Sequence, residues 1–216
     1  MLEYLRVDPL AFVLLAISII EAIALHEYAH ALAADLQGDR MPRAFGRLSL
    51  NPAKHLDPLG TILIFLVGFG WGKPVEFRPE ALASKRFGAA IVALAGPVMN
   101  LALAVVAAFI LSPLVRSGST GVLVTFLLAF FSINLLLAVF NLIPLPPLDG
   151  SRLLTIFLPP SKQKVIFFLD RYGFVILLAI VFFGWTTVIA PFHDAVGEWV
   201  LRLAGGDELI DMLTSP

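Results

Sequence analysis

The sequence contains no cysteine, and only 14% of its 216 residues are charged. The absence of cysteine excludes disulfide bonds, thiolate metal ligands and a cysteine nucleophile. The formal net charge of −1 and the absence of a basic run give no support to nucleic-acid binding. Apolar residues instead make up 59% of the chain and raise its mean hydropathy to +0.91. Because a soluble domain has about 25% charged residues, this composition predicts an integral membrane protein.

Four apolar segments are long enough to cross a bilayer as helices, which takes about 20 residues. They lie at residues 10–36, 88–113, 121–144 and 172–191. A fifth apolar stretch at 59–71 is shorter and rich in glycine, which is typical of a re-entrant or interfacial element. We therefore expect an all-α polytopic membrane protein that forms one domain over residues 1–216. It should have four full spans and a re-entrant or short hairpin element at 59–77.

Lysine and arginine are distributed unevenly among the connections between these segments. The connections at 37–58, 72–87 and 145–171 hold four each, whereas Arg6, Arg116 and Arg202 stand alone in theirs. If the stretch at 59–71 does not cross, all rich connections fall on one side, which the positive-inside rule makes cytoplasmic. This favours four spans with both termini outside the cytoplasm. From His193 onward, apolar residues recur at helical spacing, and we expect an amphipathic helix on the membrane surface.

The first apolar segment contains the motif His-Glu-x-x-His, formed by His26, Glu27 and His30. Residues i and i+4 of a helix share a face, so the two imidazoles can bind one metal ion. Neutral imidazoles suit Zn²⁺, which activates water, and Glu27 beside them can accept a proton from that water. Such a motif also arises by chance, and buried histidines are more often hydrogen-bonded core residues. Ionisable groups within a membrane span are costly and mark function, however, which favours the metal site.

A catalytic zinc takes three protein ligands and leaves one position for water. The candidates for the third ligand are His55, Asp57, Asp149 and His193. Asp149 is favoured because it follows three prolines in NLIPLPPLDG (141–150), where a helix cannot continue and its backbone must face protein or a water-filled cavity. Topology agrees, since the segments that lead to His30 and to Asp149 run in the same direction and can meet at one depth. His55 fits loop organisation better than metal ligation, and His193 is interpreted as a surface residue.

The motifs HEYAH and NLIPLPPLDG together resemble those of the site-2 protease family of intramembrane zinc metalloproteases. The similarity extends to LNPAKHLDPLGT (50–61), GWGKPV (70–75) and AGPVMN (95–100), in the order that this family shows. The resemblance implies one Zn²⁺ per chain, with a ligand set and a general base. The implied ligands are His26, His30 and Asp149, and the implied base is Glu27. It further implies that Asn100 and Asn141 help to hold substrate or to polarise its carbonyl.

The predicted function is cleavage of transmembrane segments of single-span membrane proteins, within the lipid bilayer and near its cytoplasmic side. The resemblance is to a compact form in a plasma or inner membrane, without a PDZ-like domain between the spans or a C-terminal nucleotide-sensing module. Two alternatives are a non-enzymatic zinc-binding transporter or scaffold, and a hydrolase of lipid or prenyl ends. A transporter would spread polar groups along several spans, whereas here the ionisable groups gather at one depth. Nothing in the sequence indicates an oligomeric state.

Overall fold

The computed structural model describes residues 2–67, 70–157 and 162–214. Its α-helices are α1 (Leu2–Val7), α2 (Pro9–Leu36), α3 (Met41–Ala44), α4 (Pro58–Val67), α5 (Lys85–Arg116), α6 (Val122–Asn141), α7 (Gly150–Phe157), α8 (Gln163–Phe183), α9 (Ala190–Leu203) and α10 (Asp207–Thr214). Short 3₁₀ turns lie at η1 (Pro52–Lys54) and η2 (Pro79–Ala81), and a π-helical turn, η4 (Trp185–Ile189), joins α8 to α9. The predicted all-α architecture is confirmed.

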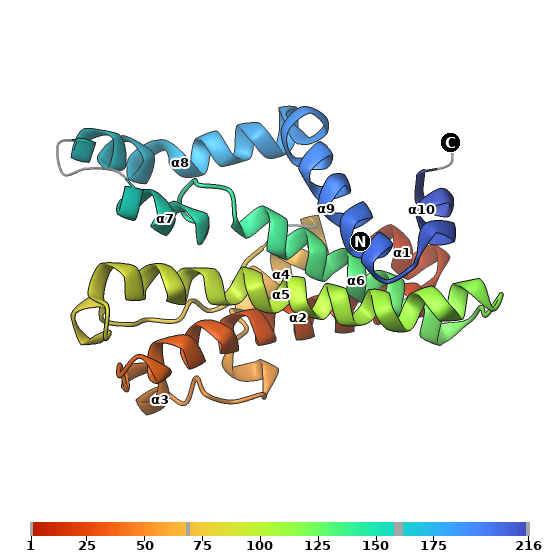
Figure 1. Ribbon diagram of the computed structural model, residues 1–216, viewed down its shortest axis with the longest axis horizontal. Coiled ribbons are helices and arrows are strands. Elements are labelled where there is room, and N and C mark those ends of the chain that lie inside the picture. Colours follow the sequence, from red (N-terminus) through yellow and green to blue (C-terminus); the bar gives the residue numbers. More distant parts are fainter. Residues whose placement is uncertain (1, 68–69, 158–161, 215–216) are drawn as a thin grey trace.

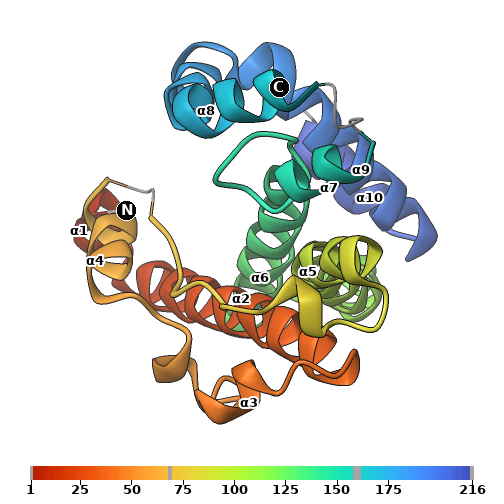
Figure 2. The same ribbon diagram turned by 90° about the vertical axis from the view of Figure 1, so that its left-hand side faces the viewer.

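Within the described residues, four helices are long and apolar enough to cross a membrane, as expected: α2, α5, α6 and α8. Of these, α2, α5 and α6 pack against one another, while α8 lies above them beyond α7 (Figures 1 and 2). The buried hydrophobic residues of α2 and α5 are mainly alanines: Ala22, Ala24, Ala29, Ala31, Ala34, Ala90, Ala93, Ala104, Ala107 and Ala108. Helices in lipid associate through close van der Waals contact, which small side chains permit.

The fourth span differs from its prediction. Helix α8 starts at Gln163 and ends at Phe183, whereas the apolar run suggested a span over residues 172–191. The prediction was wrong because it excluded Asp170 and Arg171, which the helix accommodates near its Lys/Arg-rich end. Gly184 then interrupts the helix, and the backbone continues through η4 into α9.

The stretch around α4 forms a short hairpin, which agrees with the expected re-entrant or hairpin element. The ten residues of α4 extend about 15 Å, half of the roughly 30 Å hydrocarbon layer. Leu56 and Gly72 form an antiparallel bridge, and the Lys73 N–H donates to the His55 carbonyl over 2.7 Å. The chain therefore enters and leaves this element on the same side. A Cβ on Gly60 would overlap the carbonyl oxygen of Trp71, so the close approach of the two arms requires glycine.

The predicted C-terminal amphipathic helix corresponds to α9, which α10 follows. Val200, Leu201 and Leu209 are buried in one cluster with residues of α5 and α6, whereas Trp199 is 54% exposed. These helices thus bury part of their apolar face against the protein itself. The exposed remainder is available to the membrane surface.

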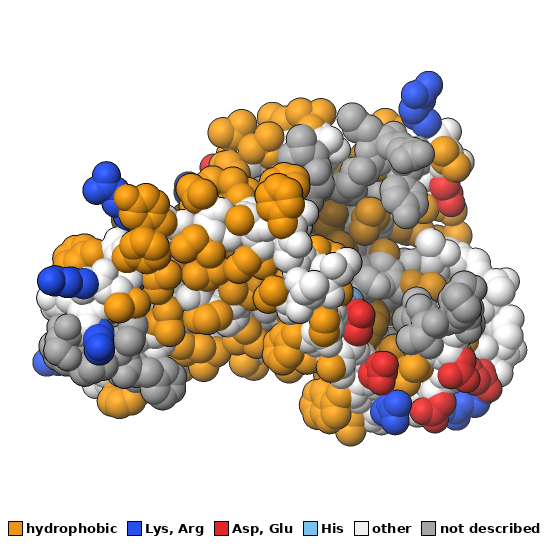
Figure 3. Space-filling view, turned by 90° about the horizontal axis from the view of Figure 1, so that it is seen from above, with side chains coloured by type: hydrophobic (Ala, Val, Ile, Leu, Met, Phe, Trp, Pro, Cys, Tyr) orange, Lys and Arg blue, Asp and Glu red, His pale blue; other side chains and the backbone are white. Residues whose placement is uncertain are grey.

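The Lys/Arg-rich connections lie at one end of the bundle. The α2–α3 region, the turn before α5 and the start of α8 are on the left of Figure 1, while both termini and the α5–α6 turn are on the right. Figure 3 shows a broad apolar face over α8, with Lys and Arg side chains at its left end and acidic side chains gathered toward the right. This arrangement agrees with the predicted topology of four spans around a non-crossing hairpin.

Candidate metal centre

Three potential metal ligands from distant parts of the chain meet between α2 and the α6–α7 connection. The Oδ2 atom of Asp149 lies 3.0 Å from His26 Nε2 and 3.3 Å from His30 Nε2. The two Nε2 atoms are 3.0 Å apart. One ligand atom from each of these residues lies within 4.8 Å of the others. The convergence that the motif spacing and the prolines predicted is therefore present in the structure.

Asp149 reaches this position because α6 ends at Asn141 and the chain turns back on itself. The connection is held by short-range bonds, such as the one from the Leu148 N–H to the Leu145 carbonyl at 2.9 Å. A Cβ on Gly150 would overlap the Leu142 carbonyl oxygen, so the start of α7 is packed tightly against the end of α6. The proline-rich sequence thus gives the predicted unwound segment, and Asp149 lies where this segment faces α2.

The hydrogen bonds of the two imidazoles leave both Nε2 atoms as electron-pair donors. His26 Nδ1 donates to Asn100 Oδ1 at 2.5 Å, and His30 Nδ1 donates to the Val92 carbonyl at 2.7 Å. A neutral imidazole with its proton on Nδ1 has a lone pair on Nε2. Two such lone pairs and a carboxylate oxygen therefore face one another, which is unfavourable unless a cation lies between them. This nitrogen and oxygen donor set fits Zn²⁺.

A chain of two buried amides supports His26 from behind. Asn100 is fully buried, and its Nδ2 donates to the Ala22 carbonyl at 3.1 Å and to Asn134 Oδ1 at 2.8 Å. These two bonds orient the Asn100 amide so that its oxygen accepts from His26. Asn134, which donates onward to the Phe130 carbonyl, was not predicted as part of the site. The signal for it was an amide within a membrane span, where an unpaired polar group is costly.

Gly96 makes room for both imidazoles. A Cβ at this position would lie 2.5 Å from His30 Nε2 and 2.6 Å from His26 Nε2. Pro97 follows Gly96 directly, within α5. The packing partner of Gly96 is the histidine pair itself, so α5 covers the centre through a position without a side chain.

A cavity of about 690 Å³ opens beside the centre, and apolar residues dominate its walls. Glu27 lines it together with the three ligands, and Glu27 Oε2 has no hydrogen-bond partner among the described residues. Asn141 also lines the cavity, and its Nδ2 donates to the Leu137 carbonyl at 3.0 Å. Asn100 does not line it, since it lies behind His26.

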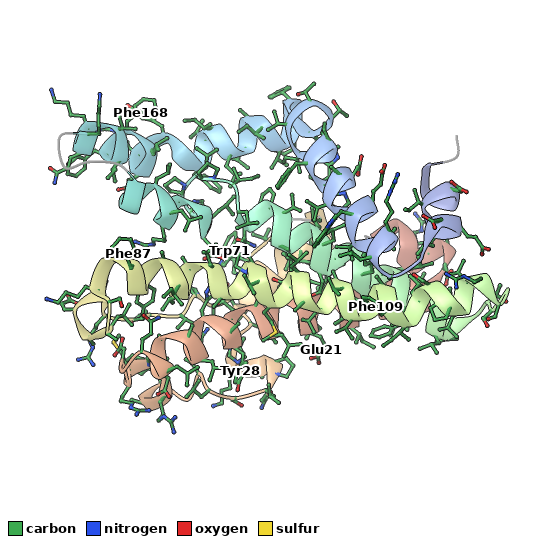
Figure 4. The ribbon with its side chains drawn as sticks, in the orientation of Figure 1. Glu21, Tyr28, Trp71, Phe87, Phe109 and Phe168 are labelled. Carbon is green, nitrogen blue, oxygen red and sulfur yellow. The ribbon has the colours of Figure 1, made fainter. Side chains whose placement is uncertain are left out.

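The other candidates singled out in the sequence lie outside the cluster. His55 is fully buried, and its Nε2 donates to the Ser49 carbonyl at 2.7 Å, in agreement with a role in loop organisation. Burial lowers the pKa of the His55 imidazole, and the neighbouring Arg47 charge acts in the same direction. His193 contacts Asp194 at 2.9 Å on the surface. Glu21 is a further acidic residue of α2, and its side chain projects away from α6 and α8 (Figure 4).

This fold and this centre define a polytopic membrane metalloenzyme. The family model described as Peptidase family M50 matches residues 12–120 and 114–180. The chain belongs to this family, the site-2 protease family. It is a membrane zinc metalloprotease whose cofactor is Zn²⁺, so the alternative of a non-enzymatic transporter or scaffold is not supported.

Relatives with this activity in their names match most of the chain. "Putative zinc metalloprotease YwhC" of Bacillus subtilis (strain 168) is 36% identical over 208 residues, which cover 93% of this chain and 91% of that protein. "Putative zinc metalloprotease Rip2" of Mycolicibacterium smegmatis is 32% identical over 203 residues, covering 89% and 71%. Its namesake in Mycobacterium tuberculosis (strain H37Rv) is 32% identical over 213 residues, covering 92% and 78%. No solved structure matches the chain.

Proposed function

We propose that this protein is an intramembrane endopeptidase that cleaves transmembrane segments of single-span membrane proteins near the cytoplasmic side. His26, His30 and Asp149 hold the zinc, and Glu27 is the general base. One observation carries the proposal: three electron-pair donors converge at 3.0–3.3 Å inside the bundle, on the wall of a cavity that Glu27 shares. A structural metal would need no free carboxylate and no cavity beside it.

The proposed chemistry uses Glu27 as a proton carrier. Zinc, when bound, supplies Lewis acidity that activates water and polarises the scissile carbonyl. Glu27 accepts a proton as the water oxygen adds to the carbonyl carbon, and it delivers that proton to the amine nitrogen as the carbon–nitrogen bond breaks. The Glu27 Oε2 atom suits this role, because it is buried and accepts no hydrogen bond from the described residues. Asn141, on the same cavity wall, has a side-chain N–H that can donate to the carbonyl oxygen.

Substrate must be extended before it can react. A peptide bond in a helix is shielded by its own hydrogen bonds, so the substrate helix unwinds beside the centre. The extended stretch at 70–77 offers a partner for the unwound strand, since Trp71, Val75 and Phe77 line the cavity. The backbone N–H groups of Val75, Glu76 and Phe77 make no hydrogen bond within the described chain. Strand pairing at this edge would hold the scissile bond by main-chain contacts, which suits substrates of varied sequence.

The depth of the centre supports cleavage near the Lys/Arg-rich side. His30 precedes the end of α2 by six residues, a distance of about 9 Å along the helix. By the positive-inside rule this end is cytoplasmic. Helix α8 forms the opposite wall of the cavity, and only Gly173 and Leu177 are buried along its described length. We infer that a substrate helix enters laterally between α4 and the weakly packed α8, since residues of both helices line the cavity.

The test is incubation of the purified protein in liposomes with a panel of single-span membrane peptides, with and without a zinc chelator. Wild type should cut at least one peptide within the half of its span nearest the cytoplasmic end, as mapped by mass spectrometry. Glu27→Gln should abolish cleavage while zinc stays bound, because Glu27 is not a ligand. Glu21→Gln makes the same change on the same helix, away from the cavity, and should leave cleavage intact. Cleavage that survives Glu27→Gln would overturn the proposal.

A further inference from the structure

Arg47 is a buried arginine that the proposed chemistry does not yet use. Only 6% of its surface is exposed, although arginine is rarely buried without a charged partner. It lies in the connection after α3, where its own N–H donates to the Pro42 carbonyl at 2.9 Å. Its Nε atom has no hydrogen-bond partner among the described residues. The terminal nitrogens of the guanidinium therefore make the contacts that hold the side chain in place.

The Arg47 guanidinium contacts a carboxylate on one side and backbone carbonyls on the other. On one side, Arg47 Nη2 lies 3.6 Å from Glu27 Oε2. On the other side, Nη1 donates to the Pro74 carbonyl at 3.2 Å, and Nη2 donates to the Lys73 carbonyl. One planar group thus joins the carboxylate beside the metal centre to the backbone of the extended stretch at 70–77. Lysine could not reproduce this geometry, because its ammonium is a single point of charge rather than a fork.

The longer of these contacts leaves the base free to act. A separation of 3.6 Å keeps Glu27 and Arg47 in electrostatic contact but exceeds the range of a hydrogen bond. Glu27 Oε2 accordingly keeps its lone pairs for a proton from water. The positive charge fixes where the carboxylate lies without occupying the atom that would react.

The other contacts fix the backbone that would hold substrate. Lys73 is bound twice, through its N–H to the His55 carbonyl and through its own carbonyl to Arg47. The far end of the stretch is attached separately, since the Arg78 N–H donates to Asp39 at 2.6 Å and the Arg78 guanidinium bonds the same carboxylate. Arg47 is thus the attachment nearest to the catalytic carboxylate, and Arg78 is an attachment without contact to it.

We propose that Arg47 is a positioning residue that sets the distance between the substrate-binding stretch at 70–77 and the Glu27 carboxylate. This inference rests on the proposed function. A peptide paired with the stretch would present its scissile carbonyl at a height determined by Lys73 and Pro74. Because the same guanidinium holds Glu27, the base and the peptide bond stay in register. Loss of Arg47 should therefore slow turnover even when substrate and zinc are both bound.

The experiment compares Arg47→Met, Arg47→Lys and Arg78→Met in liposomes with a peptide that wild type cleaves. Zinc content and the kinetic constants kcat and KM are measured for each variant. Arg78→Met is the matched control, because it loosens the same stretch without touching Glu27. A misplacement of about 1 Å can cost about 100-fold in rate, so Arg47→Met should lower kcat by roughly that factor with zinc content unchanged. Arg47→Lys should recover part of the loss, and Arg78→Met should raise KM with little change in kcat.

Three results would overturn the inference. Arg47→Met could retain the kcat of wild type, it could lose its zinc, or it could change only KM in the same way as Arg78→Met. If Arg47→Met does not fold, Arg47→Lys decides, since it preserves charge and must show a fall in kcat greater than any rise in KM. Failure of the proposed function is distinguishable from these outcomes, because it appears as cleavage that persists in Glu27→Gln.

Discussion

The most direct test of the metal centre is to add one methyl group at Gly96. In Gly96→Ala the new Cβ would lie 2.5 Å from His30 Nε2 and 2.6 Å from His26 Nε2. Non-bonded heavy atoms are in favourable contact at about 3.5–4.0 Å, so the imidazoles must retreat by about 1 Å. Zinc–nitrogen distances tolerate only about 0.2 Å of error. The substitution therefore affects both histidine ligands together.

The magnitude follows from the cost of overpacking. Extra methyl groups in a well-packed site cost about 1–3 kcal/mol, which corresponds to a loss of about 5- to 150-fold in zinc affinity. The helix itself should not suffer, because alanine is favoured over glycine in helices by about 1 kcal/mol. We expect zinc affinity, measured by competition with a chelating dye in detergent, to fall by that factor. Thermal unfolding in excess chelator should remain close to that of wild type.

Gly88→Ala provides the control within the same helix. Its Cβ would lie 2.5 Å from Gln37 Oε1, so the nominal crowding is as severe as at Gly96. The new Cβ would also lie 2.9 Å from the Leu82 Cβ, but neither Gln37 nor Leu82 belongs to the metal centre. Zinc affinity should therefore be unchanged in Gly88→Ala. If Gly96→Ala bound zinc as tightly as wild type, the histidine pair would not be the metal site, and the reasoning would be refuted.

Two further tests concern the amides and the buried acid. Asn100→Ala should lower zinc affinity by about 10- to 100-fold, since it removes the acceptor that orients His26. Equal zinc affinities in Asn100→Ala and wild type would contradict this expectation. Asn141→Ala should keep its zinc and lower turnover. Hydrogen bonds from the Arg78 and Met41 N–H groups keep the pKa of the Asp39 carboxyl below its ordinary value, although burial acts to raise it. A carboxyl whose pKa is lowered in the folded state stabilises that state at pH values above its ordinary pKa of about 3.9. This stabilisation is lost as pH falls below that value. Asp39→Asn should thus cost about 1.5–3 kcal/mol at pH 7. The difference in thermal unfolding from wild type should shrink as pH falls below about 3.9, and a difference independent of pH would count against this.

The ligand set could be predicted from the sequence because its chemistry leaves marks that do not depend on tertiary structure. Two histidines four residues apart share a helix face in any helix, and prolines before Asp149 stop any helix. The short hairpin at α4 was predicted from the length of its apolar stretch and from the distribution of Lys and Arg. The start of α8 could not be predicted in the same way. An apolar run alone does not show that Asp170 and Arg171 lie within the helix, near its Lys/Arg-rich end.

Other parts of the site depend on which helix faces which, and a sequence does not state that. From the sequence alone, Gly96 is interpreted as a glycine that allows close helix packing. The fold shows that the groups packed against it are the imidazoles of His26 and His30. From the sequence alone, Arg47 is one of several charged residues in a polar connection. In the fold, its guanidinium lies between Glu27 and the Pro74 carbonyl. Both residues act through contacts with segments distant in the chain. Their identities were visible from the start, whereas their roles required the fold.

The amide chain behind His26 indicates how a bundle with few polar residues keeps its centre in register. Asn134 of α6 accepts from Asn100 of α5, which in turn accepts from His26 and donates to the Ala22 carbonyl of α2. Apolar side chains pack with little preference for one longitudinal position, because a slide by one helical turn exchanges one alkyl contact for another. Amides buried inside a membrane helix bundle have no such freedom, since a slide would leave them unpaired. The hydrogen bonds that orient the His26 imidazole therefore also fix the longitudinal positions of α2, α5 and α6 relative to one another, at the level where the metal binds.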